Sequence, residues 1–489
     1  MFYQSTRSEY RTDDVRAVLD GIAPDGGLFV DPSLGSKPFD WRSCLQLPPL
    51  EMAKSLLGFL LPGFEDMPSL VERAYNGKFD TPELTPLVAV GDFFALELFH
   101  GPTSAFKDVA LSVLPQLISA ARRQLGETGD TLILTATSGD TGKAALEGFH
   151  DVPGTRIAVF YPDGGVSAVQ RKQMVTQRGE NVAVCALRGN FDDCQRGVKK
   201  AFSELKDRSE MHLSSANSIN IGRLAPQLVY YFIAYAELLK RRRIQAGDPV
   251  DFVVPTGNFG DILAGYMAKL LGLPVGKLVC ASNANRVLTD FFETGVYDRR
   301  RDFQKTSSPS MDILVSSNLE RLLFYVMDQK VEDVNACMEE LERVGRYQLD
   351  ETLMARLRKF FAAYSCDEDS CMETIGKIYR ETDYVCDPHT AVGFFAAEQF
   401  RRESKSDAPV VVLSTASPYK FPGAVLKAIG GDLPADEFEQ MAELQRLTGV
   451  PIPKNLATLR CAKELHRDVI GKEELSAYVL KLSGKEERL

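Results

Sequence analysis

Beyond about residue 95, short apolar runs alternate along the chain with longer stretches in which apolar residues recur every three or four positions. The short runs predict buried strands and the longer stretches predict helices, which together are typical of parallel βαβ units. The predicted strands are 131–135, 157–161, 181–187, 251–256, 277–282 and 410–414, and the predicted helices include 198–205, 226–240 and 262–271. We therefore expect an α/β fold with doubly wound, mostly parallel sheets, which bind ligands at the carboxyl ends of their strands.

The first 95 residues lack this alternation and predict an additional N-terminal domain. They contain a polar start, a turn-and-strand stretch that begins at Gly21, and proline-rich connections at 48–49 and 62–63. Towards the other end, a surface loop at 298–309 precedes a charge-rich helical stretch at 318–380, and the last fifty residues predict mostly amphipathic helix.

Length and charge narrow the class of protein. The 489 residues are 44% apolar and 25% charged, which suits a globular enzyme of two or three domains. The net charge of -10 argues against binding to nucleic acid or an anionic membrane, and the longest apolar run, 229–239, is too short to span a bilayer. The first residues lack the apolar core of a signal peptide, so we expect a cytoplasmic protein. Nine scattered cysteines form neither a disulfide framework nor a zinc-ligand set, so we expect no metal site.

One segment has the composition expected around a reactive lysine: residues 99–108, Phe-His-Gly-Pro-Thr-Ser-Ala-Phe-Lys-Asp. The Gly-Pro pair predicts a turn, and Thr103 and Ser104 are good helix-capping residues, which places Lys107 on the first turn of a helix. Partial burial beside Phe106 and the positive end of a helix dipole both lower the pKa of an amine, which suits a Schiff-base lysine. Taken alone, a Lys-Asp pair such as 107–108 is more often an ion pair at the surface.

Four polar loops follow predicted strands or precede predicted helices, and each offers backbone amides, hydroxyls or a guanidinium to an anion. They are 137–142, 217–223, 256–261 and 414–417. The first is not a nucleotide-binding Walker A loop, because only two residues separate its glycines and Ala144 replaces the required hydroxyl residue. Each loop taken alone is also explained by an ordinary turn or helix cap. The set is specific because the four loops and the lysine segment occur together in a fixed order.

On these residues, the chain resembles the threonine synthase family, which are pyridoxal-phosphate enzymes of the tryptophan-synthase-β fold type, also called fold type II. Residues 100–108 are close to the family's lysine signature, 138–142 (Ser-Gly-Asp-Thr-Gly) to its substrate loop, and 257–261 (Gly-Asn-Phe-Gly-Asp) to its phosphate cup. The stretch at 23–29, Ala-Pro-Asp-Gly-Gly-Leu-Phe, is similar to the family's N-terminal domain. The resemblance therefore covers essentially the full length.

The resemblance implies a role for each matching residue. Lys107 would carry the pyridoxal phosphate, Thr415 would face its pyridine nitrogen, and Asp140 would lie near its 3'-oxygen, where related enzymes have an asparagine. A carboxylate beside a phenolate repels it unless one of the two is protonated. The cofactor phosphate would be held by the backbone amides of Gly257, Asn258, Phe259, Gly260 and Asp261, and the substrate by Ser138, Thr141, Asn217, Ser218 and Arg223.

The implied substrate is O-phospho-L-homoserine, which reacts with water to give L-threonine and phosphate by γ-elimination and β-addition, the last step of threonine biosynthesis. The reaction needs proton removal at Cα and Cβ, and Lys107 is the base placed for it. The resemblance also implies an N-terminal domain at 1–95, a large cofactor-binding domain at 96–125 and 220–489, and a small movable substrate domain at 126–219. We expect a monomer rather than a dimer.

Two alternatives stay open at this point. Another fold type II enzyme, such as a serine or threonine dehydratase or a cysteine synthase, would not need the anion-binding cluster at 217–223. A non-catalytic scaffold that binds only a ligand or a partner would not need Lys107 and all four loops.

Overall fold

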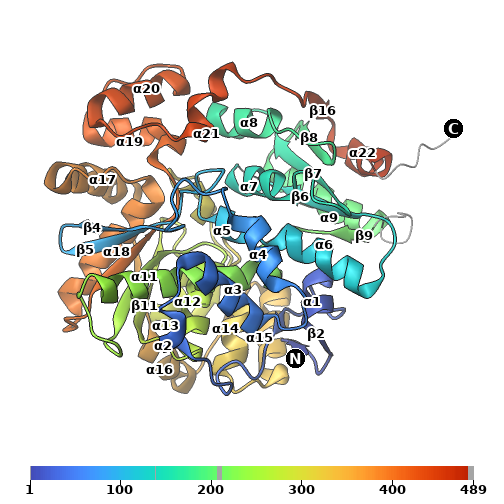
Figure 1. Ribbon diagram of the computed structural model, residues 1–489. Helices are drawn as coiled ribbons and strands as arrows, with labels where there is room; N and C mark the ends of the chain where they lie inside the picture. The colour runs from blue at the N-terminus through green and yellow to red at the C-terminus, as the bar shows by residue number, and fades with distance from the viewer. Residues whose placement is uncertain (1, 138, 206–211, 483–489) are drawn as a thin grey trace.

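The computed structural model describes residues 2–137, 139–205 and 212–482. The predicted substrate residue Ser138 lies outside this part of the chain. The described residues form two large β-sheets flanked by helices, together with a small N-terminal sheet and a two-stranded ribbon (Figure 1). No helix among them is long and apolar enough to cross a membrane.

The larger sheet has six strands in the order β14-β11-β10-β15-β5-β4. All neighbours run parallel except the edge strand β4, which forms an antiparallel hairpin with β5. The bounds are β14 Phe361–Ser365, β11 Val275–Ser282, β10 Val250–Pro255, β15 Val410–Ser414, β5 Phe93–Glu97 and β4 Leu87–Val90. Every residue of β10 and β15 is buried, which explains their nearly continuous apolar sequences.

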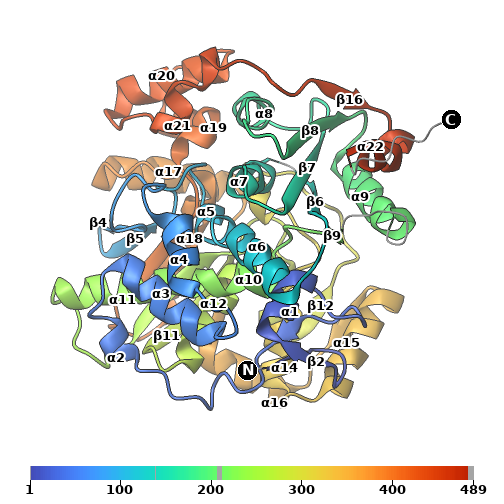
Figure 2. The same ribbon diagram turned by 45° about the vertical axis from the view of Figure 1, so that its right-hand side comes forward.

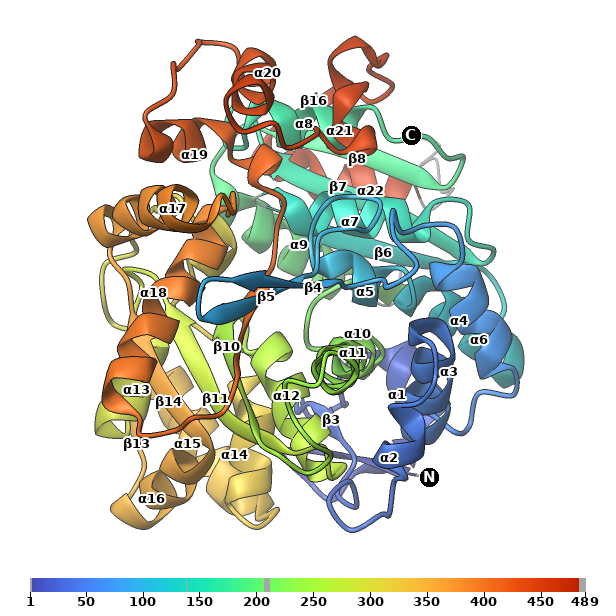
Figure 3. The same ribbon diagram turned by 60° about the vertical axis from the view of Figure 1, so that its left-hand side comes forward.

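Alternate residues of this sheet face two different helical layers. Val253, Val279 and Val412 share one core with α17, α18 and α19, whereas Phe252 and Leu278 share another with α11, α12 and α13. These helices are α11 Leu228–Lys240, α12 Gly260–Leu270, α13 Val287–Thr294, α17 Glu368–Thr382, α18 Pro388–Glu403 and α19 Pro422–Ile429. Helices on both faces of a parallel sheet confirm the predicted doubly wound fold (Figure 3).

The smaller sheet has five parallel strands in the order β16-β8-β7-β6-β9. Its strands are β16 Asp468–Ile470, β8 Val182–Leu187, β7 Thr155–Pro162, β6 Thr131–Ala136 and β9 His212–Ser214. Ile133 and Ile157 belong to the same core as the large sheet, whereas Leu134 and Phe160 pack on the other face with α9 (Phe191–Leu205) and α22 (Leu475–Leu482). Figures 1 and 2 show α9 and α22 side by side on that outer face.

The N-terminal part combines a three-stranded antiparallel sheet with four helices. The sheet has the order β2-β1-β3, with β1 Phe2–Ser5, β2 Arg11–Asp13 and β3 Phe29–Val30, and the helices are α1 Asp14–Asp20, α2 Trp41–Cys44, α3 Pro49–Leu60 and α4 Met67–Tyr75. Helix α3 contacts α11, and α1 and α4 contact α6 (Leu114–Leu125). The domain ranges stay a prediction; β4 and β5 belong to the large sheet, and β16 belongs to the small one.

The remaining elements connect these layers. The helices are α5 Lys107–Leu111, α7 Asp140–Phe149, α8 Ala168–Val175, α10 Ile221–Leu224, α14 Leu319–Val326, α15 Val331–Val344, α16 Glu351–Phe360, α20 Glu437–Thr448 and α21 Lys454–Ala457. The 3-10 turns are η1 Ala225–Gln227, η2 Pro309–Met311, η3 Pro418–Lys420, η4 Leu459–Cys461 and η5 Lys472–Glu474, and the ribbon pairs β12 Val296–Asp298 with β13 Arg346–Gln348.

The six strands predicted from the sequence all form, within two residues at each end. Two predictions for the second half of the chain need correction. The stretch 318–380 is not helical throughout, because it contains β13 and the parallel strand β14. The last fifty residues likewise contain the edge strand β16 between their short helices.

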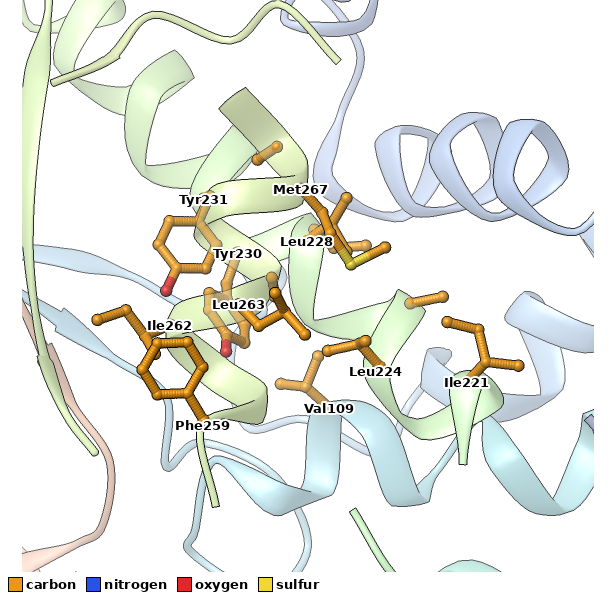
Figure 4. Packing of buried hydrophobic residues seen from close by; sticks show 14 of the residues in the cluster. Val109, Ile221, Leu224, Leu228, Tyr230, Tyr231, Phe259, Ile262, Leu263 and Met267 are labelled. Atoms are coloured by element: carbon orange, nitrogen blue, oxygen red, sulfur yellow. The ribbon is translucent and has the colours of Figure 1, made fainter. Parts of the chain in front are cut away.

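A continuous apolar cluster lies beneath the helices that carry the predicted site residues. Val109 of α5, Leu224 of α10, Leu228 of α11 and Leu263 of α12 all belong to it (Figure 4). Phe259, which is fully buried, belongs to the same cluster at the start of α12. Side-chain packing therefore sets the relative positions of the lysine segment and of two of the predicted loops, 217–223 and 256–261.

Candidate active site

The lysine segment is attached to the end of β15 by backbone hydrogen bonds. Phe106 N–H donates to the carbonyl of Thr415 (2.8 Å), and Ser417 N–H donates to the carbonyl of Ser104 (3.1 Å). Asp108 accepts hydrogen bonds from Thr103 N–H (2.8 Å) and Thr103 Oγ1 (2.5 Å), which closes the turn before α5. A Cβ at Gly101 would lie 2.5 Å from the Asp108 side chain, so the turn requires glycine. Lys107 begins α5, as predicted.

The amine of Lys107 lies in a buried, polar environment. Only 7% of Lys107 is exposed, and its Nζ donates to Ser310 Oγ at 3.2 Å. Burial lowers its pKa to about 8, against the attraction of Asp140 and with further repulsion from Lys420 and Arg223. With this pKa, about a tenth of the molecules carry a neutral amine at pH 7, far more than for an ordinary lysine, and a nucleophile or general base must be neutral.

The loop at 257–261 opens α12 at the end of β10. Its carbonyls are already bonded: Ser316 Oγ donates to the carbonyl of Gly257 (2.7 Å), and Asn318 Nδ2 to that of Asn258 (3.0 Å). Phe259 adopts a left-handed conformation (φ +63°) and provides no side-chain cap for the first amides of α12. A Cβ at Gly257 would approach the carbonyl of Ser310 to 2.6 Å. The amides at this helix N-terminus therefore suit an anion.

Asp261 and Thr415 complete the wall around Lys107. Both are 5% exposed. Burial raises the pKa of Asp261 to about 7, while two backbone amides and the charge of Lys107 lower it. Thr415 follows the last residue of β15 and leads into η3.

The loop at 137–142 brings Asp140 to the start of α7. Thr137 Oγ1 accepts hydrogen bonds from the backbone N–H of Gly139 (3.0 Å) and Gly142 (2.9 Å). Gly139 has φ +146°, and a Cβ there would lie 2.5 Å from Gln170. Thr141 is half-buried on the first turn of the helix.

Asp140 forms an ion pair with a residue that we did not predict, Lys420 of η3. Lys420 Nζ lies 2.8 Å from Asp140 Oδ1, and Gln170 Nε2 donates to the same oxygen at 3.0 Å. Both charged side chains are almost fully buried. Burial alone would raise the pKa of Asp140, but Lys420 and then Lys107 outweigh it, so the pKa lies well below its usual range.

The segment 217–223 contains a buried guanidinium. Arg223 is 6% exposed and donates from Nη1 to the carbonyl of Ala216 (2.5 Å). In the described part of the chain no carboxylate forms an ion pair with it, and burial lowers its pKa to about 10. Ser218 is buried, whereas Asn217 is exposed and accepts from Ser218 N–H at 2.7 Å.

Contacts with Val18 of α1 and with Asn318, which directly precedes α14, hold this segment in place. Asn220 caps α10 and donates to the carbonyl of Val18 at 2.9 Å. Asn318 Nδ2 donates to the carbonyl of Ser218 (3.2 Å) as well as to that of Asn258, so it joins two predicted anion-binding loops.

A second group of residues that the sequence did not reveal consists of Ser310, His389 and Asp387, and it contacts Lys107 through Ser310. Ser310 N–H donates to His389 Nε2 (3.1 Å), which assigns the ring proton to Nδ1, 2.5 Å from Asp387. Asp387 also caps α18 through the amides of His389 (3.0 Å) and Thr390 (3.1 Å). The available signal was the sequence Asp-Pro-His-Thr, which is typical of a helix start.

The structure therefore brings most predicted residues together near the starts of α5, α7, α10 and α12 and the end of β15. The members of this group that interact through their charges are Lys107, Asp140, Arg223, Asp261, Lys420 and His389. Among the described residues, no group of three or more His, Cys, Asp or Glu side chains could hold a metal ion.

The family comparisons agree with this arrangement. The family described as "Pyridoxal-phosphate dependent enzyme" matches residues 79–416, and the family described as "Threonine synthase, C-terminal" matches residues 390–470. The chain is 40% identical to threonine synthase of Pseudomonas aeruginosa, over 89% of this chain and 92% of that protein. It is 39% identical to threonine synthase-like 1 of Macaca fascicularis, over 84% of this chain but only 57% of that longer protein.

A solved structure extends the likeness to the whole fold. The pyridoxal-phosphate-bound threonine synthase of Brucella melitensis superimposes with a TM-score of 0.88 at 37% identity, over 99% of this chain and 100% of that one. Sequence and structure together show that the chain belongs to the threonine synthase family of pyridoxal-phosphate-dependent enzymes.

Proposed function

We propose that this protein is a threonine synthase, which converts O-phospho-L-homoserine and water to L-threonine and phosphate in the last step of threonine biosynthesis. The observation that carries the proposal is Arg223, a buried guanidinium without a carboxylate partner in the described part of the chain. A buried cation without a partner is costly, so its place beside Lys107 is best explained by an anionic ligand.

The residues present fit pyridoxal phosphate. The start of α12 has no side-chain cap, so the amides of Gly257, Asn258, Phe259 and Gly260 are placed for the cofactor phosphate, and the amide of Asp261 would join them by leaving its own carboxylate. Lys107 would attach the cofactor, Thr415 would face the pyridine nitrogen, and Asp140 would lie near the 3'-oxygen. The attached cofactor supplies an electron sink for a substrate carbon that has lost its proton.

Lys107 is the proton carrier that the geometry supports best. Its amine would accept the proton of Cα and, after passing that proton on, the proton of Cβ. Its hydrogen bond to Ser310 Oγ (3.2 Å) orients Nζ, and His389 positions Ser310 through the Ser310 backbone. The bond between Cγ and the phosphate oxygen then breaks, and phosphate leaves with the bonding electrons. One proton is delivered to Cγ, water adds its oxygen to Cβ, and a proton finally returns to Cα. The proton that this water releases leaves with the phosphate.

The substrate would be bound by Arg223, Ser218, Asn217, Thr141 and Ser138. The first three of these would bind its phosphate. Arg223 and Ser218 are buried, so their hydrogen bonds to phosphate form in a region shielded from water. The small domain at 126–219 would close over the substrate phosphate and exclude water until elimination is complete.

The cellular setting is a further part of the proposal. All nine cysteines are free, and eight of them are buried or partly buried, which agrees with a reducing, cytoplasmic compartment. The net charge of -10 agrees with the absence of nucleic-acid and membrane partners. We propose a monomer, which sedimentation equilibrium of the purified protein would test.

Phosphate release from O-phosphohomoserine tests the reaction, with O-acetylserine, serine and threonine as competing substrates. We expect O-phosphohomoserine to turn over much faster than the other three, whose turnover is followed by their own products because they contain no phosphate. This comparison also separates the two kinds of relative, because the chain is about equally identical to a threonine synthase and to a threonine synthase-like protein. Faster turnover of serine or O-acetylserine would assign the chain to a dehydratase or a cysteine synthase.

Arg223→Ala tests the phosphate assignment directly. A charge-assisted hydrogen bond contributes roughly 1.5 to 3 kcal/mol, so kcat/KM for O-phosphohomoserine should fall by at least that amount. Arg223→Lys should recover only part, because a point charge does not reproduce the planar guanidinium. Slow deamination of L-serine, which has no phosphate, is the control and should be nearly indifferent to Arg223. An equal loss for both substrates would make Arg223 a structural or carboxylate-binding residue.

A further inference from the structure

Two buried lysines share one buried aspartate at the centre of this site. Lys420 Nζ contacts Asp140 Oδ1 at 2.8 Å, and its side chain has no exposed surface. Asp140 is in turn the carboxylate that acts most strongly on the amine of Lys107. Lys420 also donates to the carbonyl of Thr103 at 3.1 Å, four residues before Lys107.

The arrangement is more than a link between two elements. Asp140 Oδ1 accepts from both Lys420 and Gln170, whereas Asp140 Oδ2 is buried and has no hydrogen-bond partner among the described residues. A buried carboxylate oxygen without a partner is costly and indicates a group that is absent from this structure. After Lys420, the cation that acts most strongly on the Asp140 carboxylate is Lys107.

The sequence left a difficulty that this arrangement resolves. An ionised Asp140 beside an anionic cofactor oxygen would repel it. With Lys420 as its permanent partner, Asp140 is part of a pair that is neutral overall, so an additional anionic oxygen meets no net negative charge.

We propose that Lys420 is a positioning residue for the reaction: through its ion pair it holds Asp140 ionised and neutralised, and the pair sets the charge that the nitrogen of Lys107 carries. This proposal rests on the attachment of the cofactor to Lys107 proposed above and not on the identity of the substrate. A purely structural Lys420 would instead hold η3 against α7 and have no influence on the protonation of Lys107.

The groups around Lys107 make the direction of the effect clear. The charged or titratable groups that act on the Lys107 and Asp140 side chains are Lys420 on η3, Arg223 on α10, Asp261 on α12 and His389 on α18. Lys420→Gln removes a repelling cation and leaves Asp140 to pair with Lys107, so the nitrogen of Lys107 should hold its proton to higher pH. Asp140→Asn removes the attracting anion and should have the opposite effect. The double variant Asp140→Asn/Lys420→Gln removes both charges and should resemble the wild type.

The experiment is a pH titration of the visible absorbance of the cofactor bound to the purified holoenzyme, without any substrate. The midpoint reports the proton at the nitrogen of Lys107, and an ion neighbour within a few ångströms moves such a midpoint by about 1 unit or more. We expect a higher midpoint for Lys420→Gln, a lower one for Asp140→Asn, and a value within about 0.5 units of wild type for the double variant. Because no substrate is used, the result does not depend on threonine synthase activity.

Matched variants separate positioning from stability. Lys143→Gln breaks the 2.9 Å ion pair with Glu147 on the same helix and should not move the midpoint. Lys420→Arg keeps the charge and should keep the wild-type midpoint even if thermal stability falls. If Lys420→Gln does not fold, the lower midpoint of Asp140→Asn and the return towards the wild-type value in the double variant still decide the question. Unchanged midpoints, or shifts of both single variants in the same direction, would overturn the proposal.

Discussion

At the scale of single residues, the site is a group of buried charges that depend on one another. Lys107, Asp140, Arg223 and Lys420 are all at most 7% exposed, and only Asp140 and Lys420 compensate each other in a direct ion pair. Burying such charged groups without a ligand lowers the free energy of unfolding, so ligand binding should stabilise the fold as well as permit chemistry.

Lys107→Ala should abolish turnover. The variant removes the amine that attaches the cofactor and moves protons, and it also removes a buried amine whose pKa burial has lowered. We therefore expect the visible absorbance of the attached cofactor to disappear, while the thermal unfolding temperature of the apoprotein stays the same or rises. Phosphate-release assays without added amines provide the measurement. Appreciable turnover there would mean that the catalytic lysine lies elsewhere.

Asp261 should make the stability of the apoprotein fall between pH 5 and pH 8. Burial raises its pKa to about 7. The folded protein holds this proton more tightly than the unfolded chain, so the contribution of Asp261 to stability is complete below about pH 4 and is lost as the pH rises through about 7. Asp261→Asn cannot ionise. Relative to wild type it should gain about 1 to 3 kcal/mol in the free energy of unfolding between pH 5 and pH 8.

Urea unfolding of both apoproteins at the two pH values provides the test. Asp25→Asn is a suitable control, because the pKa of this carboxyl is lowered by hydrogen bonds from Ser8, Gly27 and Ser5, which outweigh its desolvation. That variant should not gain stability as the pH rises. Parallel pH dependences for wild type and Asp261→Asn would show that Asp261 is ionised throughout.

Sequence patterns revealed residues whose chemistry depends on local context. Lys107 was found because a Gly-Pro turn and two capping residues precede it, and the 257–261 loop because glycines follow a buried strand. Lys420 was missed because a buried lysine and an exposed one have the same sequence signal until the partner is known. That partner, Asp140, is 280 residues away in the chain.

At the scale of elements, Asp387 has two roles at the start of α18: it caps the helix and it positions His389, which belongs to the site. Asp387 accepts hydrogen bonds from the first amides of the helix, from Nδ1 of His389 and from the Thr390 hydroxyl. His389 in turn holds the backbone of Ser310, whose hydroxyl contacts Lys107. The start of one helix therefore determines the orientation of the lysine.

Asp387→Ala should lower the free energy of unfolding by about 2 to 4 kcal/mol, because it removes the helix cap and leaves several buried donors unsatisfied. Asp387→Asn retains an acceptor for the amides and should cost about 1 kcal/mol. Both should lower kcat by releasing His389 and Ser310. Denaturant unfolding and steady-state kinetics measure the two effects. Full activity in the destabilised Asp387→Ala variant would show that α18 only supports the fold.

Strands β14 and β16 escaped prediction for physical reasons. Strand β14 begins at Phe361, directly after α16 ends at Phe360, with no glycine or proline to mark the change. Its Phe-Ala-Ala-Tyr-Ser sequence has weak strand propensity at the two alanines, and its place beside β11 stabilises it instead. Strand β16 is a three-residue edge strand, too short for any alternation to be visible.

At the scale of the whole molecule, the small sheet has one face in the main core and one face of its own. Ile133 and Ile157 pack with residues of the large domain, so a closing movement of the small domain must be a hinge motion that keeps this contact. Leu134 and Phe160 pack only with α9 and α22. The range predicted for the small domain, 126–219, does not include β16 of the small sheet, because the pairing of β16 with β8 joins residues almost 300 positions apart.

Leu475→Ala should therefore destabilise one side of the molecule selectively. Leu475 is 1% exposed, and its methyl group lies against Gly197 of α9, where an added Cβ would come within 2.7 Å. Truncation of a buried leucine costs about 2 to 5 kcal/mol, here within the outer layer of the small sheet. Hydrogen exchange should rise in β6, β7, β8 and α9 but stay slow in β10 and β11, and cofactor absorbance should persist. Leu433→Ala, at a residue that is 56% exposed, should change neither. Equal acceleration in both sheets would mean that the chain opens as a single cooperative unit and that the small domain has no stability of its own.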